Sequence, residues 1–487
     1  MPKRSECSVH PVVLPSSGRS LRIRAHGIAV ALGVMCFSVL LGCKDLTGSQ
    51  SLPAGVNDPS FYNTPAGALG MRTAALYNLE KILPGYITDA GLITDELTSS
   101  SIGASLGTLL QSGLPPGGSY DERILPEQSS GDVADQDYGN LQGVRANIEQ
   151  ALGALAAYDT SVADTGTVKV RRGELYALLG YDEILLADLF CSGVPLSTFD
   201  FGKDFTYQPS STRDQVYEDA IVQEDSALAL AGSSSNGTQV RNVALVLQGR
   251  AWLDLGQYAK ASQVVSAVPD QFQYQLAITG GKTVDQAGDS VPAGVISGTV
   301  ANREGLNGLP FALGGDPRTA VINQELSSTG ATVYYPARYN QGVFNPFTVA
   351  DWIEARLIQA EAALQARDTT TWLALLNQLR ATATVVGQSA APLNQLSDPG
   401  SSSGDSARVA LTFQERAYWL FLTGHRQGDL RRLLRQYKTI YKSQDQVYPT
   451  GPYTAPGTGV YGGDVTAAIS NAEFTNPKYH GCIDRNP

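Results

Sequence analysis

Two groups of acidic residues could supply the paired carboxylates of a glycosidase. Such an enzyme places two carboxyl groups about 5–10 Å apart on either side of a sugar bond. Asp95 and Glu96 are adjacent in the chain, and adjacent residues on a turn rarely present both groups that way, so a helix cap or a loop hydrogen bond is the expected role. Glu354 and Glu361 lie seven residues apart on one face of a predicted helix. For these two we expect scaffold salt bridges to arginines such as Arg380, Arg416 or Arg426.

Motifs for other chemistry are missing from the sequence. It contains no nucleophile elbow, no Walker phosphate loop and no His-x-x-x-His pair. Gly314-Gly315 lacks the strand–helix context of a phosphate site, and Asp316-Pro-Arg318 is typical of a pinned loop. Only His425 and His480 follow the N-terminal leader, which excludes a histidine-rich metal site. We therefore predict no catalytic residues, no cofactor and no metal.

The first 43 residues have the order of a bacterial secretory signal. Five basic residues precede an uncharged apolar run from Gly27 to Gly42, and Gly42 stands directly before Cys43. The run is shorter than the roughly 20 residues of a membrane-spanning helix. Leu40-Leu41-Gly42-Cys43 resembles the lipobox of bacterial lipoproteins, so we expect cleavage before Cys43 and acyl chains on that cysteine. The alternative is an ordinary signal peptide in which Cys43 is incidental.

Cleavage before Cys43 would change the charge and the cysteine count. Without residues 1–42 the chain has 30 basic and 45 acidic residues, a net charge of −15 instead of −11. This acidity argues against nucleic-acid binding and against electrostatic docking on anionic lipid. With Cys43 acylated, Cys191 and Cys482 are left as a pair in an oxidising compartment, so we predict a disulfide between them. The alternative is two separate buried thiols.

Apolar residues recur at helical spacing along most of the chain. The first predicted helix opens at Thr64-Pro65, where threonine caps and proline suits the first turn, and it ends before Pro84. No stretch shows the sustained alternation and hairpin turns of strands. The predicted helices cover residues 64–83, 133–158, 168–189, 212–230, 241–255, 259–268, 349–366 and 372–383.

Two capping boxes mark further helix starts. Thr212 has Gln215 three residues on, and Thr412 has Glu415 at the same distance. In each box the two side chains satisfy backbone N–H groups of the first turn. We expect the second box to open a helix that Gly424 ends.

One helical pair has the spacing of a tetratricopeptide repeat. Gly249, Trp252, Gly256, Tyr258 and Ala261 fall where such a repeat has small and aromatic residues, which allow close helix packing. The stretches between helices are too long for mere connections, so some should be functional. We therefore predict a signal peptide over 1–42 and, over 43–487, one all-α domain. Its helical-pair scaffold lies mainly in 64–83, 133–268, 347–383 and 412–436, and its long-loop binding lobe mainly in 84–132 and 270–346.

Motif blocks in order along the chain resemble those of the SusD/RagB family of outer-membrane nutrient-binding lipoproteins. The clearest is Gly424-His-Arg426-Gln-Gly-Asp429-Leu430-Arg-Arg432, after Glu415-Arg416. The others are Thr94-Asp95-Glu96-Leu97, Tyr181 to Leu196, Thr212 to Ala229, the pair around Trp252, Asp316-Pro-Arg318, Glu354 to Ala362 and Asn377-Gln-Leu-Arg380. The chain departs from the family at Trp419 and Thr423, where acids are usual, and at Cys191 and Cys482.

The resemblance implies a binding protein that is not an enzyme. Members of the family sit on the outer face of the outer membrane, held by a lipid anchor. They cap a SusC-like TonB-dependent transporter and deliver oligosaccharides, or in some members peptides, to it. The resemblance therefore implies these partners and this location for the present chain.

Sugar binding needs aromatic faces and hydrogen-bonding side chains, and we expect the loops to supply both. Trp252, Trp352, Trp372 and Trp419 fall on predicted helices, so packing is their expected role. We expect the loops 84–140 and 270–346 to share the ligand site. Its candidate residues are Tyr86, Asp89, Tyr120, Tyr138, Tyr334, Tyr335, Arg338, Tyr339 and Asn340.

Two other functions stay open at this stage. A helical-repeat lipoprotein could organise outer-membrane proteins without binding a nutrient. A helical lipoprotein glycosidase would use the acids considered above, and it is the less favoured of the two.

Overall fold

The computed structural model describes residues 62–98, 118–158, 165–276, 299–326, 332–339, 346–382, 392–400, 405–453 and 459–487. The leader, Cys43 and Asn340 lie outside these residues. Within the described ranges, no helix combines the length and the apolar character that a membrane crossing needs.

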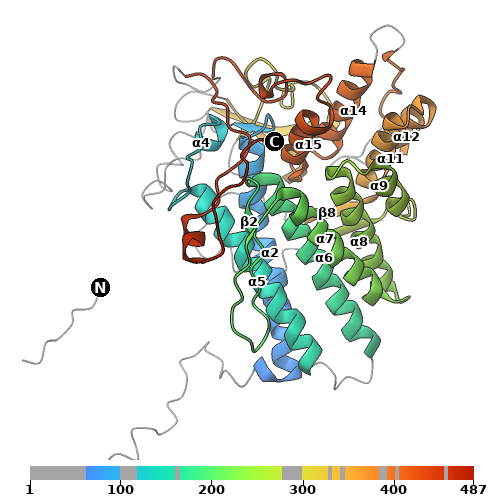
Figure 1. Cartoon of the computed structure of the whole chain (residues 1–487). Coiled ribbons are helices and arrows are strands. Elements are labelled where there is room, and N and C mark those ends of the chain that lie inside the picture. The colour runs from blue at the N-terminus through green and yellow to red at the C-terminus, as the bar shows by residue number, and fades with distance from the viewer. Residues whose placement is uncertain are drawn as a thin grey trace, which may run out of the picture. The chain divides into compact units, whose positions relative to one another are not determined.

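Long helices packed side by side make up most of the structure, as Figure 1 shows. The pairs α6–α7, α2–α5, α7–α8, α11–α12 and α5–α6 pack most extensively. The predicted all-α scaffold is therefore confirmed. The helices are α2 (Pro65–Leu92), α4 (Gly118–Asp121), α5 (Val133–Tyr158), α6 (Thr165–Leu189), α7 (Arg213–Ala231), α8 (Ser235–Asp254), α9 (Tyr258–Val265), α11 (Trp352–Gln365), α12 (Thr369–Thr382), α14 (Asp405–Trp419) and α15 (His425–Gln436).

The tetratricopeptide-like pair is present as α8 and α9. A Cβ atom on Gly249 would lie 2.3 Å from Cγ1 of Val265, so only glycine allows this approach. Gly256 turns the chain between the helices with a φ of 71°. The four tryptophans lie on helices as predicted, and all but the half-buried Trp252 are buried.

Helix α2 corrects one predicted boundary, because it continues through Pro84 to Leu92. Proline costs the helix one backbone hydrogen bond. The residues beyond it, from Tyr86 to Leu92, are all buried, so this part of the helix is enclosed on every side. Tertiary packing therefore outweighs the local preference, and the segment from residue 84 begins as scaffold instead of loop.

The second capping box is a wrong prediction. Helix α14 begins at Asp405, and Thr412 lies inside it, where its hydroxyl donates to the carbonyl of Arg408 and accepts from Nε1 of Trp372. The helix ends at Trp419. Gly424, with a φ of 82°, caps the start of α15 instead of ending the earlier helix. The first box, at Thr212 and Gln215, is confirmed at the start of α7.

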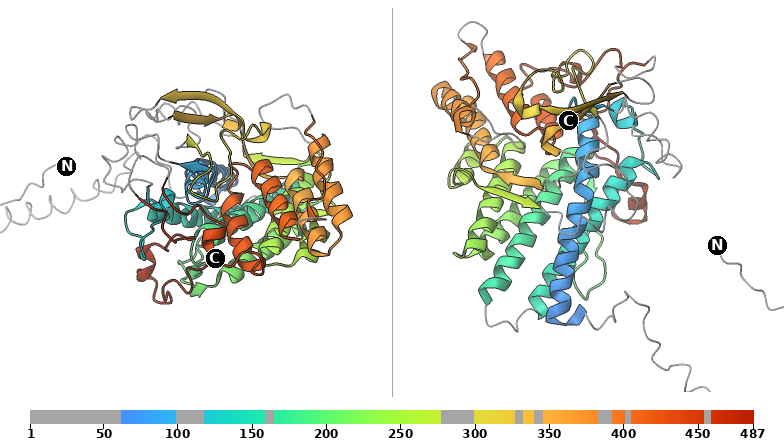
Figure 2. Two further views of the ribbon diagram at one scale, coloured as in Figure 1. Left: turned by 90° about the horizontal axis from the view of Figure 1, so that it is seen from above. Right: turned by 180° about the vertical axis from the view of Figure 1, so that it is seen from behind.

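Short antiparallel strand pairs, which the sequence patterns did not predict, lie between the helices. Figure 2 shows the β6–β7 hairpin beyond the C-terminal end of α2. Its strand β7 is held against β5, because the backbone N–H of Tyr334 donates to Oγ1 of Thr299 over 2.7 Å. The pairs are β1 (Leu97–Thr98) with β5 (Thr299–Val300), β2 (Val194–Pro195) with β3 (Ser210–Ser211), β4 (Gln273–Leu276) with β8 (Phe347–Asp351), and β6 (Val321–Leu326) with β7 (Thr332–Pro336).

Candidate ligand-binding site

The turn between α14 and α15 joins the loop lobe to the helical scaffold. Arg426 donates two hydrogen bonds to the carboxylate of Asp95, over 2.7 and 2.9 Å. The backbone N–H of Leu422 donates to Glu96, and the Tyr339 hydroxyl donates to the carbonyl of Leu422. Loop segments far apart in the sequence are thereby fixed to one turn, as a preorganised site requires.

Arg318 makes a second junction between lobe and scaffold. It donates to Asp316, two residues before it, and to the carboxylate of Glu415 on α14. Arg380 on α12 donates to the same carboxylate over 2.7 Å. The Asp316-Pro-Arg318 segment therefore pins a loop.

Of the acids considered for hydrolysis, Asp95, Glu354 and Glu361 are buried in structural ion pairs, and Glu96 is buried and accepts a hydrogen bond from the Leu422 N–H. Arg250 donates to both oxygens of Glu354, over 2.6 and 2.7 Å. Although burial favours the neutral form, Arg250 and His425 together lower the pKa of Glu354 to about 2. Glu361 pairs in the same way with Arg432. The expectation of scaffold salt bridges is confirmed. Of the expected arginines only Arg416 is a partner, at 3.9 Å from Glu361, and the other partners differ from those expected.

Burial gives Glu96 an unusual titration, with a pKa of about 8, against the opposing effects of the Leu422 N–H and Arg426. Because the pKa of Glu96 is raised in the folded state, its contribution to stability is fully present at pH values below the ordinary glutamate pKa. This contribution is lost as pH rises through about 8. Glu96→Gln keeps an acceptor for Leu422, so we expect it to gain about 1–4 kcal/mol relative to wild type between pH 5 and pH 8. Urea unfolding at both pH values measures this gain.

The matched control is Glu218→Gln, because Glu218 is exposed on α7. Its difference from wild type should stay the same at both pH values. A difference between Glu96→Gln and wild type that is also independent of pH would contradict the assignment.

Four of the nine candidate binding residues are tyrosines buried inside the protein. Their hydroxyls donate to protein acceptors: Tyr86 to the carbonyl of Leu185, Tyr120 to Asp137, Tyr138 to Glu473 and Tyr339 to the carbonyl of Leu422. In this conformation their rings pack in the interior, so we assign these four tyrosines a structural role and not direct contact with a ligand.

Asp89 is buried as well, beside Asp137. Burial raises the pKa of Asp89, and the charge of Asp137 raises it further. A carboxyl group held in this way is a hydrogen-bonding residue of the interior. Like the four tyrosines, it is buried in the interior.

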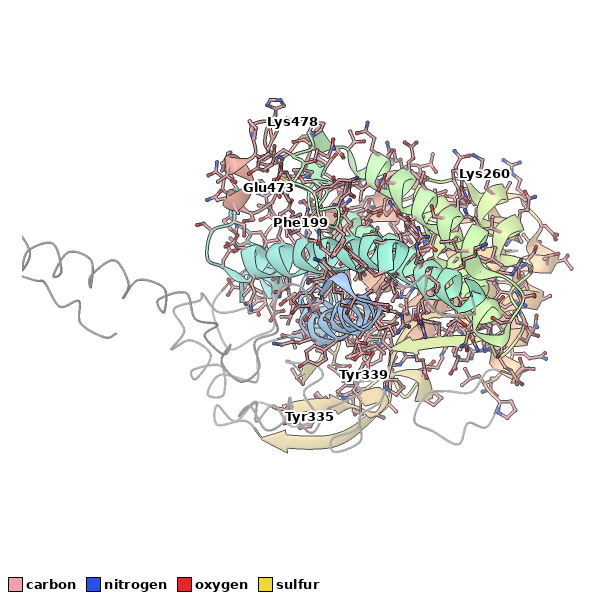
Figure 3. All side chains as sticks on the ribbon, turned by 90° about the horizontal axis from the view of Figure 1, so that it is seen from below. Phe199, Lys260, Tyr335, Tyr339, Glu473 and Lys478 are labelled. Atoms are coloured by element: carbon pink, nitrogen blue, oxygen red, sulfur yellow. A yellow bond between two sulfur atoms is a disulfide. The ribbon has the colours of Figure 1, made fainter. Side chains whose placement is uncertain are left out.

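Three candidate residues are half-buried on the β6–β7 hairpin and the 3-10 helix that follows it (Ala337–Tyr339). Tyr334 and Tyr335 are consecutive in β7, so their side chains point to opposite faces. Figure 3 shows Tyr335 on the hairpin and Tyr339 closer to the helices. Arg338 donates to the carbonyl of Trp419 over 3.2 Å. Tyr334 packs against the hydrophobic core, so we call only Tyr335 and Arg338 the hairpin surface.

A second feature is a loop that sequence reasoning did not assign to a site. Residues 196–209, here called the strap, fold back on themselves through paired backbone hydrogen bonds between Thr198 and Thr206. Phe201 packs where Gly153 stands on α5, since a Cβ atom there would lie 2.5 Å from Cβ of Phe201. The strap carries a run of aromatic residues that could have signalled it: Phe199, Phe201, Phe205 and Tyr207.

Between the strap and helices α5, α6 and α7 lies a cleft of about 840 Å³, which we call the strap cleft. Figure 1 shows the strap as the green loop running down beside α5. The volume falls in the range of small-molecule sites. The lining mixes charged, amide, aromatic and aliphatic side chains, among them Arg172, Tyr176, Phe201, Asp219 and Gln223.

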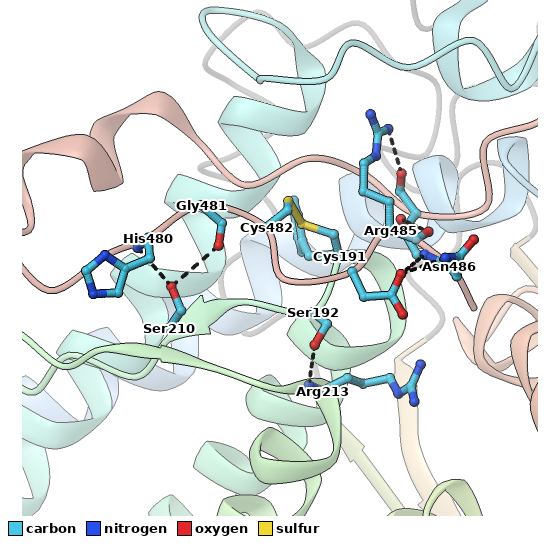
Figure 4. Close-up of a disulfide and its surroundings, with 12 residues drawn as sticks. Cys191, Ser192, Ser210, Arg213, His480, Gly481, Cys482, Arg485 and Asn486 are labelled. Carbon is cyan, nitrogen blue, oxygen red and sulfur yellow. Dashed lines mark hydrogen bonds between the residues drawn. A yellow bond between two sulfur atoms is a disulfide. The ribbon is translucent and has the colours of Figure 1, made fainter.

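The predicted disulfide is confirmed. Cys191, just after α6, is bonded to Cys482, with their Cα atoms 6.0 Å apart. Figure 4 shows the bond and its surroundings. The C-terminal segment also pairs with this part of the chain through backbone bonds from Cys191 to Ala467 and from Ile483 to Ser192. The disulfide therefore fastens the C-terminal segment to the end of α6.

Comparisons with known proteins give matches among solved structures only. No family model and no curated protein matches the chain. A SusD-like protein from Bacteroides fragilis NCTC 9343 shares 12% identity, with 88% of this chain and 98% of that chain covered and a TM-score of 0.57. A SusD-like carbohydrate-binding protein from Bacteroides vulgatus ATCC 8482 shares 14%, covering 86% and 97%, with a TM-score of 0.54.

A structure described as a laminarin-binding SusD-like protein shares 14% identity, covering 85% of this chain and 98% of that chain, with a TM-score of 0.51. At such low sequence identities, the structural similarity shows a shared fold only. The resemblance that the motif blocks indicated is confirmed at that level, across nearly the whole length of the similar structures. The protein therefore has the SusD-like fold, with a tetratricopeptide-like helical scaffold.

Proposed function

We propose that the protein is a lipid-anchored protein of the outer membrane, facing the exterior. In this role it binds nutrient oligosaccharides, or peptides, and delivers them to a SusC-like TonB-dependent transporter. The observation that carries the proposal is the fold: structures described as carbohydrate-binding and laminarin-binding align over 97% and 98% of their own length. Fold alone does not fix a ligand, so the site must be argued from its residues.

The hairpin surface supports an oligosaccharide site. A tyrosine ring offers a flat face for a sugar and a hydroxyl for hydrogen bonding, and a guanidinium donates to sugar hydroxyls. Tyr335 and Arg338 lie three residues apart in the sequence. The bond of Arg338 to Trp419 and that of Tyr339 to Leu422 tie this segment to the α14–α15 turn. A ligand there would meet a preorganised surface.

The proposed anchor is the acylated Cys43. Two or more acyl chains hold a protein stably on a membrane, since each buried methylene adds about 0.8 kcal/mol. The acidic body has no attraction to anionic lipid, so the anchor carries the attachment.

The partnership with a transporter is tested in the native host. Tagged protein extracted from membranes in mild detergent should co-purify with a large TonB-dependent barrel. Cys43→Ser, which removes the acylated thiol, should move the protein from the membrane fraction to the soluble fraction. Recovery of the wild-type protein without any such barrel, from a host that encodes one alongside, would falsify the delivery role.

A further inference from the structure

We propose that the strap cleft is a second binding site, which takes a short peptide with free termini. It lies on the helical scaffold, apart from the hairpin surface, and the argument for it does not depend on the proposed sugar site. The proposal stands on the charge at the two ends of the cleft and on the distance between them.

A cation without a partner lines one end of the cleft. Arg172, on α6, has neither a hydrogen bond nor an ion pair within the described part of the chain, and its Nε atom is buried. A buried donor without an acceptor is costly, and a guanidinium pairs best with a carboxylate through two parallel hydrogen bonds. Tyr176, one turn further along α6, lines the same cleft. This end suits the C-terminal carboxylate of a peptide.

Carboxylates line the other end. Glu149, Glu218 and Asp219 all face the cleft. Besides Arg172, the cations of the lining are Arg145, bound to Glu183 over 3.2 Å and to Glu149 over 3.1 Å, and Lys203, bound to Asp200 over 2.9 Å. Glu218 and Asp219 have no ion pair within the described residues. This end therefore carries net negative charge and suits the N-terminal ammonium group of a peptide.

The packing of α6 on α7 sets the distance between the two ends. A Cβ atom on Gly173 would meet Ala227 and Leu230 of α7, whereas one on Gly180 would meet Ala220 and Glu224, so the helices are antiparallel. Asp219 on α7 therefore lies beside a part of α6 that is about ten residues beyond Arg172. At 1.5 Å per residue, this separation along the helix axis is about 15 Å. An extended peptide rises about 3.3–3.6 Å per residue, so about four residues span this distance.

The middle of the cleft accepts side chains. Leu152, Leu179, Val222 and Phe201 give it apolar walls, and Gln208 and Gln223 offer amide groups for a peptide backbone. A neutral oligosaccharide would leave the charges at the two ends unused. The separated charges therefore favour a peptide over a sugar.

The test is calorimetric titration of the whole mature chain with tetra-alanine. We expect the peptide with free termini to bind, and amidation of its C-terminus to weaken binding at least tenfold. Arg172→Gln should reduce affinity for the free peptide to that for the amidated one. Arg171→Gln, the matched control on the neighbouring residue outside the cleft lining, should leave both affinities unchanged.

A second variant keeps the test informative if Arg172→Gln folds poorly. Val222 is 57% exposed, so Val222→Trp should fill the cleft without disturbing the core and should abolish tetra-alanine binding. Tyr335→Ala should leave tetra-alanine binding intact, which separates this site from the hairpin surface. No binding of tetra-alanine, an unchanged preference for the free carboxylate in Arg172→Gln, or binding of maltotetraose that Val222→Trp blocks would overturn the proposal.

Discussion

Replacing Glu361 with alanine is expected to destabilise the folded protein by about 3–5 kcal/mol. Glu361 is fully buried on α11, and it accepts hydrogen bonds from Arg432 over 2.6 and 3.0 Å and from the Tyr437 hydroxyl over 2.7 Å. Without it, the buried Arg432 loses two hydrogen bonds and Arg416 loses an ion-pair partner at 3.9 Å, so Asp429 is left between them, with Asp254 beside Arg432. Breaking a buried ion pair by removing one partner leaves an uncompensated charge.

Urea unfolding followed by circular dichroism measures this loss. Glu218→Ala is the matched control, because Glu218 is an exposed glutamate on a helix of the same scaffold. It should change the free energy of unfolding by less than about 0.5 kcal/mol. A loss of under 1 kcal/mol in Glu361→Ala would show that the cluster around Arg432 does not hold the scaffold together.

Loss of the disulfide is expected to destabilise the fold by about 2–5 kcal/mol. Cys191 and Cys482 are 291 residues apart in the sequence, so the bond strongly restricts the unfolded chain. The double variant Cys191→Ala and Cys482→Ala should also loosen the segment after Ala467, which pairs with Leu189 and Cys191. Unfolding in urea gives the free energy, and hydrogen exchange of residues 464–487 reports the loosening.

Reductant provides the control for that measurement. It should lower the stability of the wild-type chain to that of the double variant and should leave the double variant unchanged. Equal stability of the oxidised and reduced wild-type chains would contradict a structural role for the bond.

The parts of the fold that were predictable are those set by local signals. Thr64 and Pro65 start α2 as expected, and Thr212 with Gln215 starts α7, because a cap depends on residues a few positions apart. The close packing at Gly249 could be predicted from the repeat spacing, since a repeat fixes which residues face the next helix.

Errors arose where distant residues decide the outcome. Pro84 stays inside α2 because the helix buries its far half in the core, and Thr412 bonds to Trp372 instead of capping a helix. Glu354 pairs with Arg250, more than a hundred residues away. Such partners depend on which helices pack together, and no local pattern records that.

The candidate site was harder to predict than the fold. A loop tyrosine can stack on a ligand or fill the interior, and composition does not separate these roles. Tyr86 and Tyr138 are in the interior, whereas Tyr335 is half-buried on the hairpin. The aromatic residues of the strap lie in a segment without periodicity, so no sequence pattern predicts that they line a cleft. The strap lines the cleft where Phe201 packs on Gly153, two residues far apart in the sequence.

The central claim is that the hairpin surface binds oligosaccharides. Its most direct test is a glycan array that includes laminarin oligosaccharides, probed with wild type, Tyr335→Ala, and Tyr77→Ala as a control on an exposed tyrosine of α2. We predict that wild type and Tyr77→Ala bind at least one glycan class, and that Tyr335→Ala binds it at least tenfold more weakly, a loss of about 1.4 kcal/mol or more. Equal glycan binding by all three proteins, or by none, would contradict the claim.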